Sequence, residues 1–190
     1  MQIEFEATFL NVNKDEIRAR LKSVGAVLIY PEYIMKRLVF EPPIQIPGGW
    51  LRVRQEAEKV TMSLKIVDGD KIENQKEIEL TINSVEDGVS FLENIGAKNK
   101  SYQETLRELW KLDGCEICID TWPGLNPYVE VESDNEEKVK LAANKLGFEY
   151  STAYFGSVDG VYLSELGIPK AVIDSEPVIT FENPPQHYEK

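Results

Sequence analysis

The chain has 190 residues, of which 42% are hydrophobic and 28% are charged, a composition typical of a soluble globular protein with a full core. Its 21 lysines and arginines face 33 aspartates and glutamates, and the formal charge of −12 argues against broad binding to nucleic acid or to an anionic membrane. No apolar run approaches the roughly 18 residues of a membrane-spanning helix. The N-terminus lacks the pattern of a secretion signal, so a cytoplasmic location is expected.

Predicted strands and helices follow one another along the chain with mostly short connections, which favour antiparallel pairing. Asn13 with Glu16 has the pattern of a helix N-cap, and Gly25 ends that helix. Asp113-Gly114 is a strong turn signal between two strands. The predicted strands are 2–12, 26–41, 50–56, 59–67, 76–82, 102–112, 115–122 and 128–132, and the predicted helices are 13–25, 84–96, 134–146 and 157–166, the third capped by Asp134.

This order of elements predicts one α+β domain over residues 1–170. Eight strands are enough to close into an antiparallel barrel, a tunnel whose outside the helices would cover. Residues 171–190 contain Pro177, Pro184 and Pro185 and are expected to form an extended or disordered tail.

The polar faces of the strands carry pairs of like charge. Side chains at positions i and i+2 of a strand share a face, and several strands oppose an apolar face to a polar one. One interpretation is a sheet with one face on a core and one face in water. Like charges two residues apart repel each other, however, which is unusual for a face in water. The pairs are Glu4 with Glu6, Arg52 with Arg54, Glu77 with Glu79, and Glu130 with Glu132.

A barrel with its helices outside would turn these charged faces into its lumen. Burying so many carboxylates and cations would be very costly if the lumen held nothing else. Arginine binds phosphate oxygens bidentately, and clustered carboxylates hold Mg²⁺ or Mn²⁺, which bridge to phosphates. The pattern therefore favours a lumen that binds a triphosphate together with a divalent cation.

Six motifs in order resemble those of the CYTH superfamily, which comprises class IV adenylate cyclases, thiamine triphosphatases and related tripolyphosphatases. The resemblance runs from about residue 2 to residue 166. The motifs are Glu4-Phe5-Glu6-Ala7-Thr8 for E-x-E-x-K, Trp50-Leu51-Arg52-Val53-Arg54 for L-R-x-R, Ser63-Leu64-Lys65 for a strand with a phosphate-binding lysine, Glu77-Ile78-Glu79 for E-x-E, Arg107 for K-x-R, and Asp120-Thr121-Trp122 with Tyr128-Val129-Glu130-Val131-Glu132 for a closing D…E-x-E segment.

The resemblance implies an eight-stranded antiparallel tunnel that binds a triphosphate and Mg²⁺ or Mn²⁺. It implies a triphosphate phosphohydrolase or a class IV adenylate cyclase acting on ATP, thiamine triphosphate or inorganic tripolyphosphate. By the same resemblance, the candidate metal ligands are Glu4, Glu6, Asp120, Glu130 and Glu132, and the candidate phosphate-binding residues are Arg37, Arg52, Arg54, Lys65 and Arg107. Glu4, Glu6 and Arg107 are the catalytic candidates, and Glu77 and Glu79 are candidates for orienting a basic neighbour or touching metal.

The chain departs from the family pattern at its lysines. Thr8 replaces the lysine of E-x-E-x-K, Thr105 replaces that of K-x-R, and the last helix has none, with Lys170 just beyond it. A missing cation at a developing phosphate charge costs about 3 kcal/mol of transition-state stabilisation, by analogy with a lost oxyanion donor. The alternative is therefore a non-catalytic protein that binds nucleotide or polyphosphate, and a third reading is a plain interaction barrel. The sequence leaves both monomer and homodimer open.

Redox, zinc and triad chemistry have little support. Cys115 and Cys118 are spaced C-x-x-C, but positions i and i+3 of a strand point to opposite faces. No second pair of Cys or His completes a zinc site. The only histidine, His187, lies in the proline-containing tail, so the material for a histidine-based triad is missing.

Overall fold

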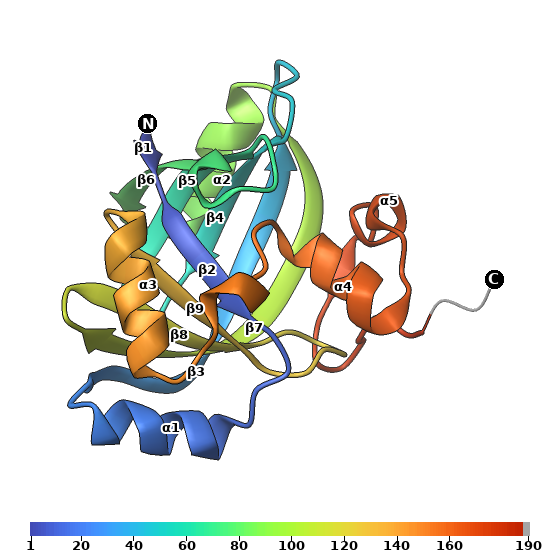
Figure 1. Cartoon of the computed structure of the whole chain (residues 1–190). Helices are drawn as coiled ribbons and strands as arrows, with labels where there is room; N and C mark the ends of the chain where they lie inside the picture. The colour runs from blue at the N-terminus through green and yellow to red at the C-terminus, as the bar shows by residue number, and fades with distance from the viewer. Residues whose placement is uncertain (188–190) are drawn as a thin grey trace.

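An antiparallel β-barrel with helices on its outside forms the body of the molecule (Figure 1). The computed structural model describes residues 1–187. The strands are β1 (Gln2–Ile3), β2 (Phe5–Phe9), β3 (Val27–Glu41), β4 (Gly49–Gln55), β5 (Val60–Val67), β6 (Gln75–Ile82), β7 (Lys98–Leu112), β8 (Cys115–Thr121), β9 (Tyr128–Ser133) and β10 (Val178–Ile179). The helices are α1 (Lys14–Ser23), α2 (Val85–Asn94), α3 (Glu136–Lys145), α4 (Val158–Leu166) and α5 (Lys170–Ile173), with 3₁₀ turns η1 (Ile72–Asn74) and η2 (Tyr150–Thr152).

Nine strands of the described residues follow one another round the barrel in the order β1-β6-β5-β4-β3-β7-β8-β9-β2. β1 and β2 are two parts of one N-terminal strand interrupted at Glu4, whose backbone N–H donates to the carbonyl of Gln75 (3.0 Å). Because β1 pairs with β6 and β2 with β9, this strand nearly closes the ring. The predicted α+β fold and antiparallel tunnel are confirmed. The predicted count of eight is one short because the alternation of residues 2–12 does not reveal the interruption.

Side-chain caps set the helix starts. Asn13 accepts hydrogen bonds from the backbone N–H groups of Asp15 and Glu16 (3.0 and 3.2 Å), as the sequence pattern predicts. α3 is capped by Asn135, which accepts from the N–H of Lys138 (3.0 Å), and the predicted cap at Asp134 is one residue too early. The carboxylate of Asp134 instead pairs with the Lys138 ammonium (2.8 Å).

The apolar faces of the strands point outward, and the helices cover much of them. α1 and α3 pack on the outer face of β2, β8 and β9, where the largest cluster of buried hydrophobic side chains lies. A smaller cluster forms where α2 packs on β4, around Val53 and Leu92. Because side chains alternate along a strand, this arrangement turns the charged faces of the same strands into the lumen.

The segment after α4 differs from the expected extended or disordered tail. α5 and β10 pack beside the barrel, and β10 pairs in parallel with Tyr102 and Gln103 of β7 (Figure 1). Lys100 of β7 forms an ion pair with Asp174 (2.6 Å), which also holds this segment. Residues 188–190 of the expected tail lie outside the described residues. None of the helices described is both long and apolar enough to cross a membrane.

Candidate functional site

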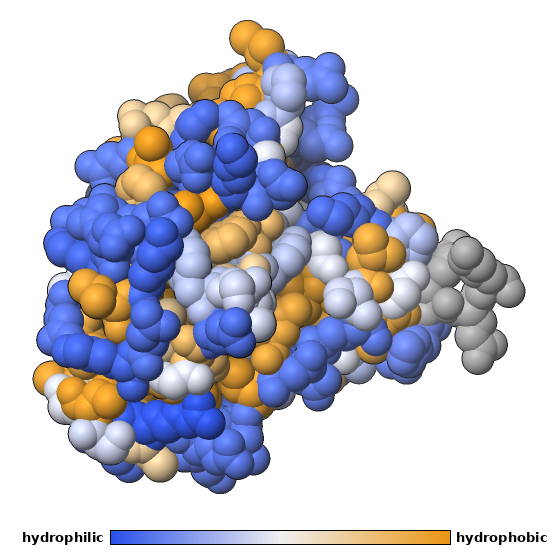
Figure 2. Space-filling view, in the orientation of Figure 1, coloured by the Kyte–Doolittle hydropathy of each residue, from blue (hydrophilic) through white to orange (hydrophobic). Residues whose placement is uncertain are grey.

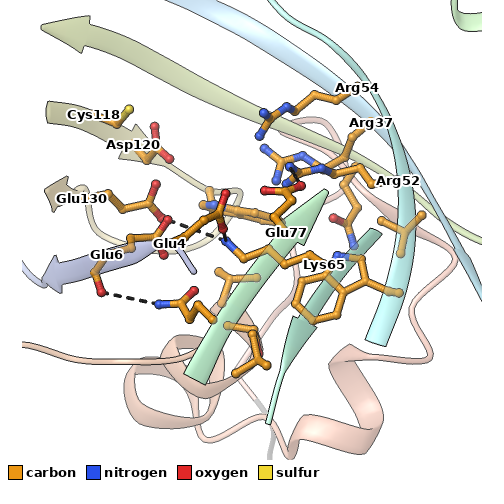
Figure 3. A pocket seen from close by; sticks show the side chains of 18 of the residues that line it. Glu4, Glu6, Arg37, Arg52, Arg54, Lys65, Glu77, Cys118, Asp120 and Glu130 are labelled. Carbon is orange, nitrogen blue, oxygen red and sulfur yellow. Dashed lines mark hydrogen bonds and ion pairs between the residues drawn. The ribbon is translucent and has the colours of Figure 1, made fainter. Parts of the chain in front are cut away.

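The lumen of the barrel is a cavity of about 660 Å³ with a charged lining. Figure 3 shows carboxylates on one side, arginines on the other, and Lys65 with Glu77 between them. All twelve charged residues named as site candidates from the sequence line this cavity: Glu4, Glu6, Arg37, Arg52, Arg54, Lys65, Glu77, Glu79, Arg107, Asp120, Glu130 and Glu132.

Four arginines form what we call the basic wall: Arg37 on β3, Arg52 and Arg54 on β4, and Arg107 on β7. Arg52 donates to Glu77 (2.9 Å), and Arg54 donates to both Glu79 and Glu56 (2.9 Å each). Burial works against the charged form of Arg54, but Glu56 and Glu79 raise its pKa overall. These carboxylates fix the direction of both guanidinium groups within the lumen.

Arg107 is held by carboxylates of the two strands that follow its own round the barrel, Asp120 of β8 and Glu130 of β9. Its Nε donates to Asp120 (2.8 Å), its Nη2 donates to the other oxygen of the same carboxylate, and Nη2 also reaches Glu130 (2.6 Å). This fork-to-carboxylate geometry raises the pKa of Arg107 well above its ordinary value, against the effect of burial. Arg107 therefore links the basic wall to the carboxylates.

Arg37 is the exception in the basic wall, because no carboxylate of residues 1–187 forms an ion pair with it. It donates to the hydroxyl of Thr105 (2.7 Å), its guanidinium lies 4.6 Å from the ring centre of Trp122, and its Nε has no hydrogen-bond partner among the described residues. It lies directly opposite Arg54 in the β3–β4 ladder. Burial, followed by repulsion from Arg52, Arg54 and Arg107, lowers the pKa of Arg37 to about 9. This is a buried cation that lacks an anion.

The carboxylates of β2 and β9 form what we call the acidic wall: Glu6 of β2 with Glu130 and Glu132 of β9. Glu6 lies directly opposite Glu132, a placement that is unfavourable for like charges. Burial and the charge of Glu6 raise the pKa of Glu132 to about 7. Burial, then Glu6 and Asp120, raise the pKa of Glu130 well above its ordinary value. Arg107 contacts Glu130 and Lys65 lies 3.7 Å from Glu6, but Glu132 has no ion pair among the described residues, so this wall holds more negative than positive charge.

Lys65 lies between the two walls. Its ammonium is 3.0 Å from Glu4 and 3.7 Å from Glu6, and these carboxylates raise its pKa despite burial. Burial raises the pKa of Glu4 to about 8, although Lys65 opposes the rise. Burial raises the pKa of Glu77, but Arg52, Glu4 and Lys65 together outweigh burial and lower it to about 2, so Glu77 keeps its charge. Burial thus favours the protonated form of Glu4, whereas Glu77 remains ionised.

No group of three or more His, Cys, Asp or Glu side chains in residues 1–187 is placed to hold a metal ion as the side chains stand. The donors of the acidic wall are nevertheless of the type that fits Mg²⁺ or Mn²⁺, since these cations take carboxylate oxygens. Glu6 faces Glu132, and burial leaves Glu130 and Glu132 with raised pKa values, so a cation would relieve a repulsion already present. The chemistry of the wall fits a divalent cation, and small side-chain shifts would be needed to close a ligand set.

Some lining residues were not predicted from the sequence. Glu116 lies opposite Glu132 and shares a strand face with Cys118 and Asp120, a spacing that would have pointed to it. Trp50 lines the cavity on the same face of β4 as Arg52 and Arg54, and the same alternation would have placed it there.

Three further lysines line the cavity, Lys59, Lys100 and Lys170, and Lys100 follows no alternation signal. Ser101 pairs with Val39 and Asn99 with Phe40, so Lys100 is the extra residue of a bulge. Lys170 reaches the cavity from α5 and lies 3.6 Å from Asp159.

The two threonines that replace family lysines are both buried. Thr8 follows Glu6 on the lumen face and lies opposite Glu130, and Thr105 accepts the hydrogen bond of Arg37. Cys118 lines the lumen whereas Cys115 lies in the helix-covered core, and both are free thiols. The opposite orientation expected for the C-x-x-C pair is therefore observed.

The CYTH domain profile matches residues 44–161, which is more than half of the chain. The chain belongs to the CYTH family. Comparison with curated protein sequences gives no match to this CYTH chain.

Solved structures share the fold of this CYTH protein at low sequence identity. A candidate adenylate cyclase from Vibrio parahaemolyticus is 17% identical with a TM-score of 0.71, covering 84% of this chain and 97% of that one. The protein PH1819 from Pyrococcus horikoshii is 22% identical with a TM-score of 0.67, covering 85% and 99%. A candidate adenylyl cyclase from Hippeastrum, described as having a dominant triphosphatase activity, is 14% identical with a TM-score of 0.56, covering 90% and 99%.

Proposed function

We propose that this CYTH protein binds a triphosphate in its tunnel together with Mg²⁺ or Mn²⁺ and breaks one of its phosphoanhydride bonds. The observation that supports this most is Arg37, a buried cation with no carboxylate partner and an unsatisfied Nε. A buried charge without a partner is costly, and a bound anion removes that cost. A chain of phosphates supplies several anionic oxygens within one lumen.

The basic wall is the proposed phosphate site. Arg52, Arg54 and Arg107 are already oriented by carboxylates, so little side-chain freedom is lost when the phosphates bind. Lys65 contributes a further positive charge from between the walls. Both carboxylate oxygens of Asp120 accept hydrogen bonds from Arg107. We therefore propose that Asp120 positions Arg107 and is not a primary metal ligand.

The acidic wall is the proposed metal site, with Glu6, Glu130 and Glu132 as ligands and Glu4 as a further candidate. When bound, the cation would neutralise phosphate oxygens and lower the pKa of an attacking water. The same residues would serve either of two reactions, which differ in the attacking group. If water attacks, the protein is a triphosphate phosphohydrolase, and if the ribose 3′-hydroxyl of ATP attacks the α-phosphorus, it is a class IV-type cyclase that releases pyrophosphate.

Hydrolysis is the first reaction to test, because the Hippeastrum structure is described with a dominant triphosphatase activity. Binding without turnover is the second candidate. It is favoured by Thr8 and Thr105, since both are buried and neither supplies a cation where the family pattern has lysine. The acidic wall then lacks a lysine beside Glu130.

A turnover panel with ATP, thiamine triphosphate and tripolyphosphate, each with Mg²⁺ and with Mn²⁺, tests this function. Release of phosphate or pyrophosphate from one substrate, with cyclic AMP measured in parallel, would separate hydrolase from cyclase. Calorimetric binding of a triphosphate without any product would select the binder. Absence of both binding and turnover for all three compounds would contradict the proposal.

The metal assignment has its own test in the double variant Glu130→Ala/Glu132→Ala. We expect a folded protein whose triphosphate binding no longer responds to Mg²⁺ or Mn²⁺. Glu116→Ala is the matched control, because Glu116 lies at the half-exposed end of the same carboxylate row. Unchanged metal dependence in the double variant would remove Glu130 and Glu132 from the site.

A further inference from the structure

The C-terminal segment builds the wall at one end of the tunnel. β8 pairs with β7 over Leu106–Leu112, and β10 pairs with the same edge of β7 at Tyr102 and Gln103, so β10 continues the barrel wall where β8 ends. α5 precedes β10 and lies beside the same end (Figure 1). Figure 2 shows α4 and α5 as a lobe beside the barrel, with a surface that mixes hydrophobic and hydrophilic residues. The CYTH profile ends at residue 161, so this part of the wall comes from residues beyond the profile.

This end of the cavity has an apolar lining. Val39 of β3, Ile173 of α5 and Ile179 of β10 line it, and the last two are only 4% and 1% exposed. Ile173 and Ile179 belong to one cluster of buried hydrophobic side chains with Trp122. The ring centre of Trp122 lies 4.6 Å from the guanidinium of Arg37. The apolar end of the cavity therefore begins directly beside the arginine that lacks an anion.

The charged side chains at this end are already paired with one another. Lys100 lies 2.6 Å from Asp174, and Lys170 lies 3.6 Å from Asp159, and all four residues line the cavity. Two cations and two anions leave this end without net charge, in contrast to the basic wall, where Arg37 has no carboxylate partner among residues 1–187. A further phosphate would have to break one of these ion pairs, whereas an uncharged group would leave both intact.

One amide side chain faces this end with most of its hydrogen-bonding capacity unused. Gln103 lies opposite Arg37 in the β3–β7 ladder and beside Ile179 of β10. Its amide nitrogen donates a long hydrogen bond to the hydroxyl of Ser101 (3.4 Å), and its amide oxygen accepts none from the described residues. An amide offers a donor and an acceptor side by side, and the edge of a nucleobase matches this pair of groups.

We propose that this end of the tunnel binds the base of a nucleoside triphosphate, with Ile173, Ile179 and Gln103 as specificity-determining residues. The inference rests on the proposed function, since it places the phosphates on the basic wall and extends the substrate from there into the apolar end. An uncharged planar ring fits apolar walls with one free amide, whereas inorganic tripolyphosphate has no group to place there. The cationic ring of thiamine triphosphate would meet no free carboxylate, because Asp159 and Asp174 are paired with lysines.

Calorimetric titration of the full chain with ATP, tripolyphosphate and thiamine triphosphate, each with Mg²⁺, tests the substrate class. We expect ATP to bind roughly tenfold more tightly than tripolyphosphate, the smaller end of the discrimination that apolar contacts provide. Equal or tighter binding of tripolyphosphate would overturn this inference and leave the proposed function standing. Tighter binding of thiamine triphosphate than of ATP would overturn the assignment of an uncharged ring. Absence of binding for all three would contradict the proposed function and the inference with it.

Two neighbouring positions of β10 give a matched pair of variants. Ile179→Ala removes an apolar side chain from the cavity and should weaken ATP binding roughly tenfold while leaving tripolyphosphate binding unchanged. Val178→Ala is the control, because Val178 is 40% exposed and lies outside the cavity lining, and it should leave both affinities unchanged. Gln103→Leu, on β7, tests the same end with β10 intact, and we expect the same selective loss of ATP affinity. Equal losses of ATP and tripolyphosphate affinity in Ile179→Ala and Gln103→Leu, or no loss in either, would overturn the specificity role.

Discussion

The two walls of the tunnel differ in how their buried charges are paired. In the basic wall each arginine except Arg37 is paired with a carboxylate at 2.6–2.9 Å. In the acidic wall Glu6 lies opposite Glu132, which has no ion pair among the described residues, while Arg107 contacts Glu130 and Lys65 contacts Glu4 and Glu6. Carboxylates thus orient three arginines of the basic wall before any ligand binds. Arg37 remains as the buried cation without an anion. The carboxylates of the acidic wall repel one another, and binding of a cation or of protons would relieve this repulsion.

The largest expected effect is on the stability of the fold. Arg52→Ala leaves the buried Glu77 without its main partner, and we expect a loss of about 3 kcal/mol in the free energy of unfolding. Arg37→Met removes a buried cation that has no carboxylate, and we expect the ligand-free protein to keep or gain stability. Urea denaturation of the two variants beside the parent measures the contrast. Equal losses would mean that Arg37 is compensated as well as Arg52.

Stability and triphosphate affinity should respond in opposite ways at Arg37: the substitution that costs no stability should weaken binding. Arg37→Met should weaken binding by about 1.5–3 kcal/mol, the range for hydrogen bonds to charged groups. Arg37→Lys should recover only part of this, because an ammonium lacks the planar fork of the guanidinium. Calorimetric titration with tripolyphosphate measures both. Lys111→Met, on an exposed surface position outside the lumen, is the control that should bind normally.

Lysine should have opposite effects at Thr8 and at Thr105, the two positions where threonine replaces a lysine of the family pattern. Thr8→Lys places a cation between the acidic wall and the substrate, opposite Glu130, and should raise kcat/KM by about tenfold on one triphosphate, equivalent to about 1.4 kcal/mol. Thr105→Lys puts a second cation where Arg37 donates its hydrogen bond, in a site with no exposed surface, and should weaken phosphate binding. Steady-state kinetics on the three substrates distinguish them. A fast parent that Thr8→Lys slows would mean that threonine is adapted to the natural substrate.

The smallest effect concerns pH and the acidic wall. The pKa of Glu132 is about 7 in the folded protein against an ordinary 4.5, so the folded state holds its proton to higher pH than the unfolded chain does. Between pH 4.5 and 7 the folded state binds more protons, and the free energy of unfolding therefore falls as pH rises. Glu4, raised to about 8, extends the fall. In protein treated with a chelator, Glu132→Gln should reduce this pH-dependent fall in the free energy of unfolding by about 1 kcal/mol.

Thermal denaturation of Glu132→Gln and the parent at a series of pH values measures this difference. Glu93→Gln is the control, since Glu93 is exposed on α2, outside the lumen. A parent whose stability rises between pH 4.5 and 7 would contradict the expected repulsion in the acidic wall.

Much of the tunnel follows from the sequence because alternation along strands is a local property. The spacing of Arg52 with Arg54 and of Glu130 with Glu132 places each pair on one face whatever the neighbours are. The N-cap at Asn13 is equally local, since its acceptor and donors lie within three residues. The family motifs then ordered these faces round one lumen, where all twelve predicted side chains lie.

Only the tertiary structure decided which charges meet and which do not. The pairing of Arg107 with Asp120 and Glu130, the isolation of Arg37 and the opposition of Glu6 to Glu132 depend on strand register, which joins residues far apart in the chain. The bulge that turns Lys100 into the cavity arises in the same way. Local patterns determine the face of each side chain, whereas register and ring closure determine its partner, because a one-residue shift would exchange every contact while leaving the patterns intact.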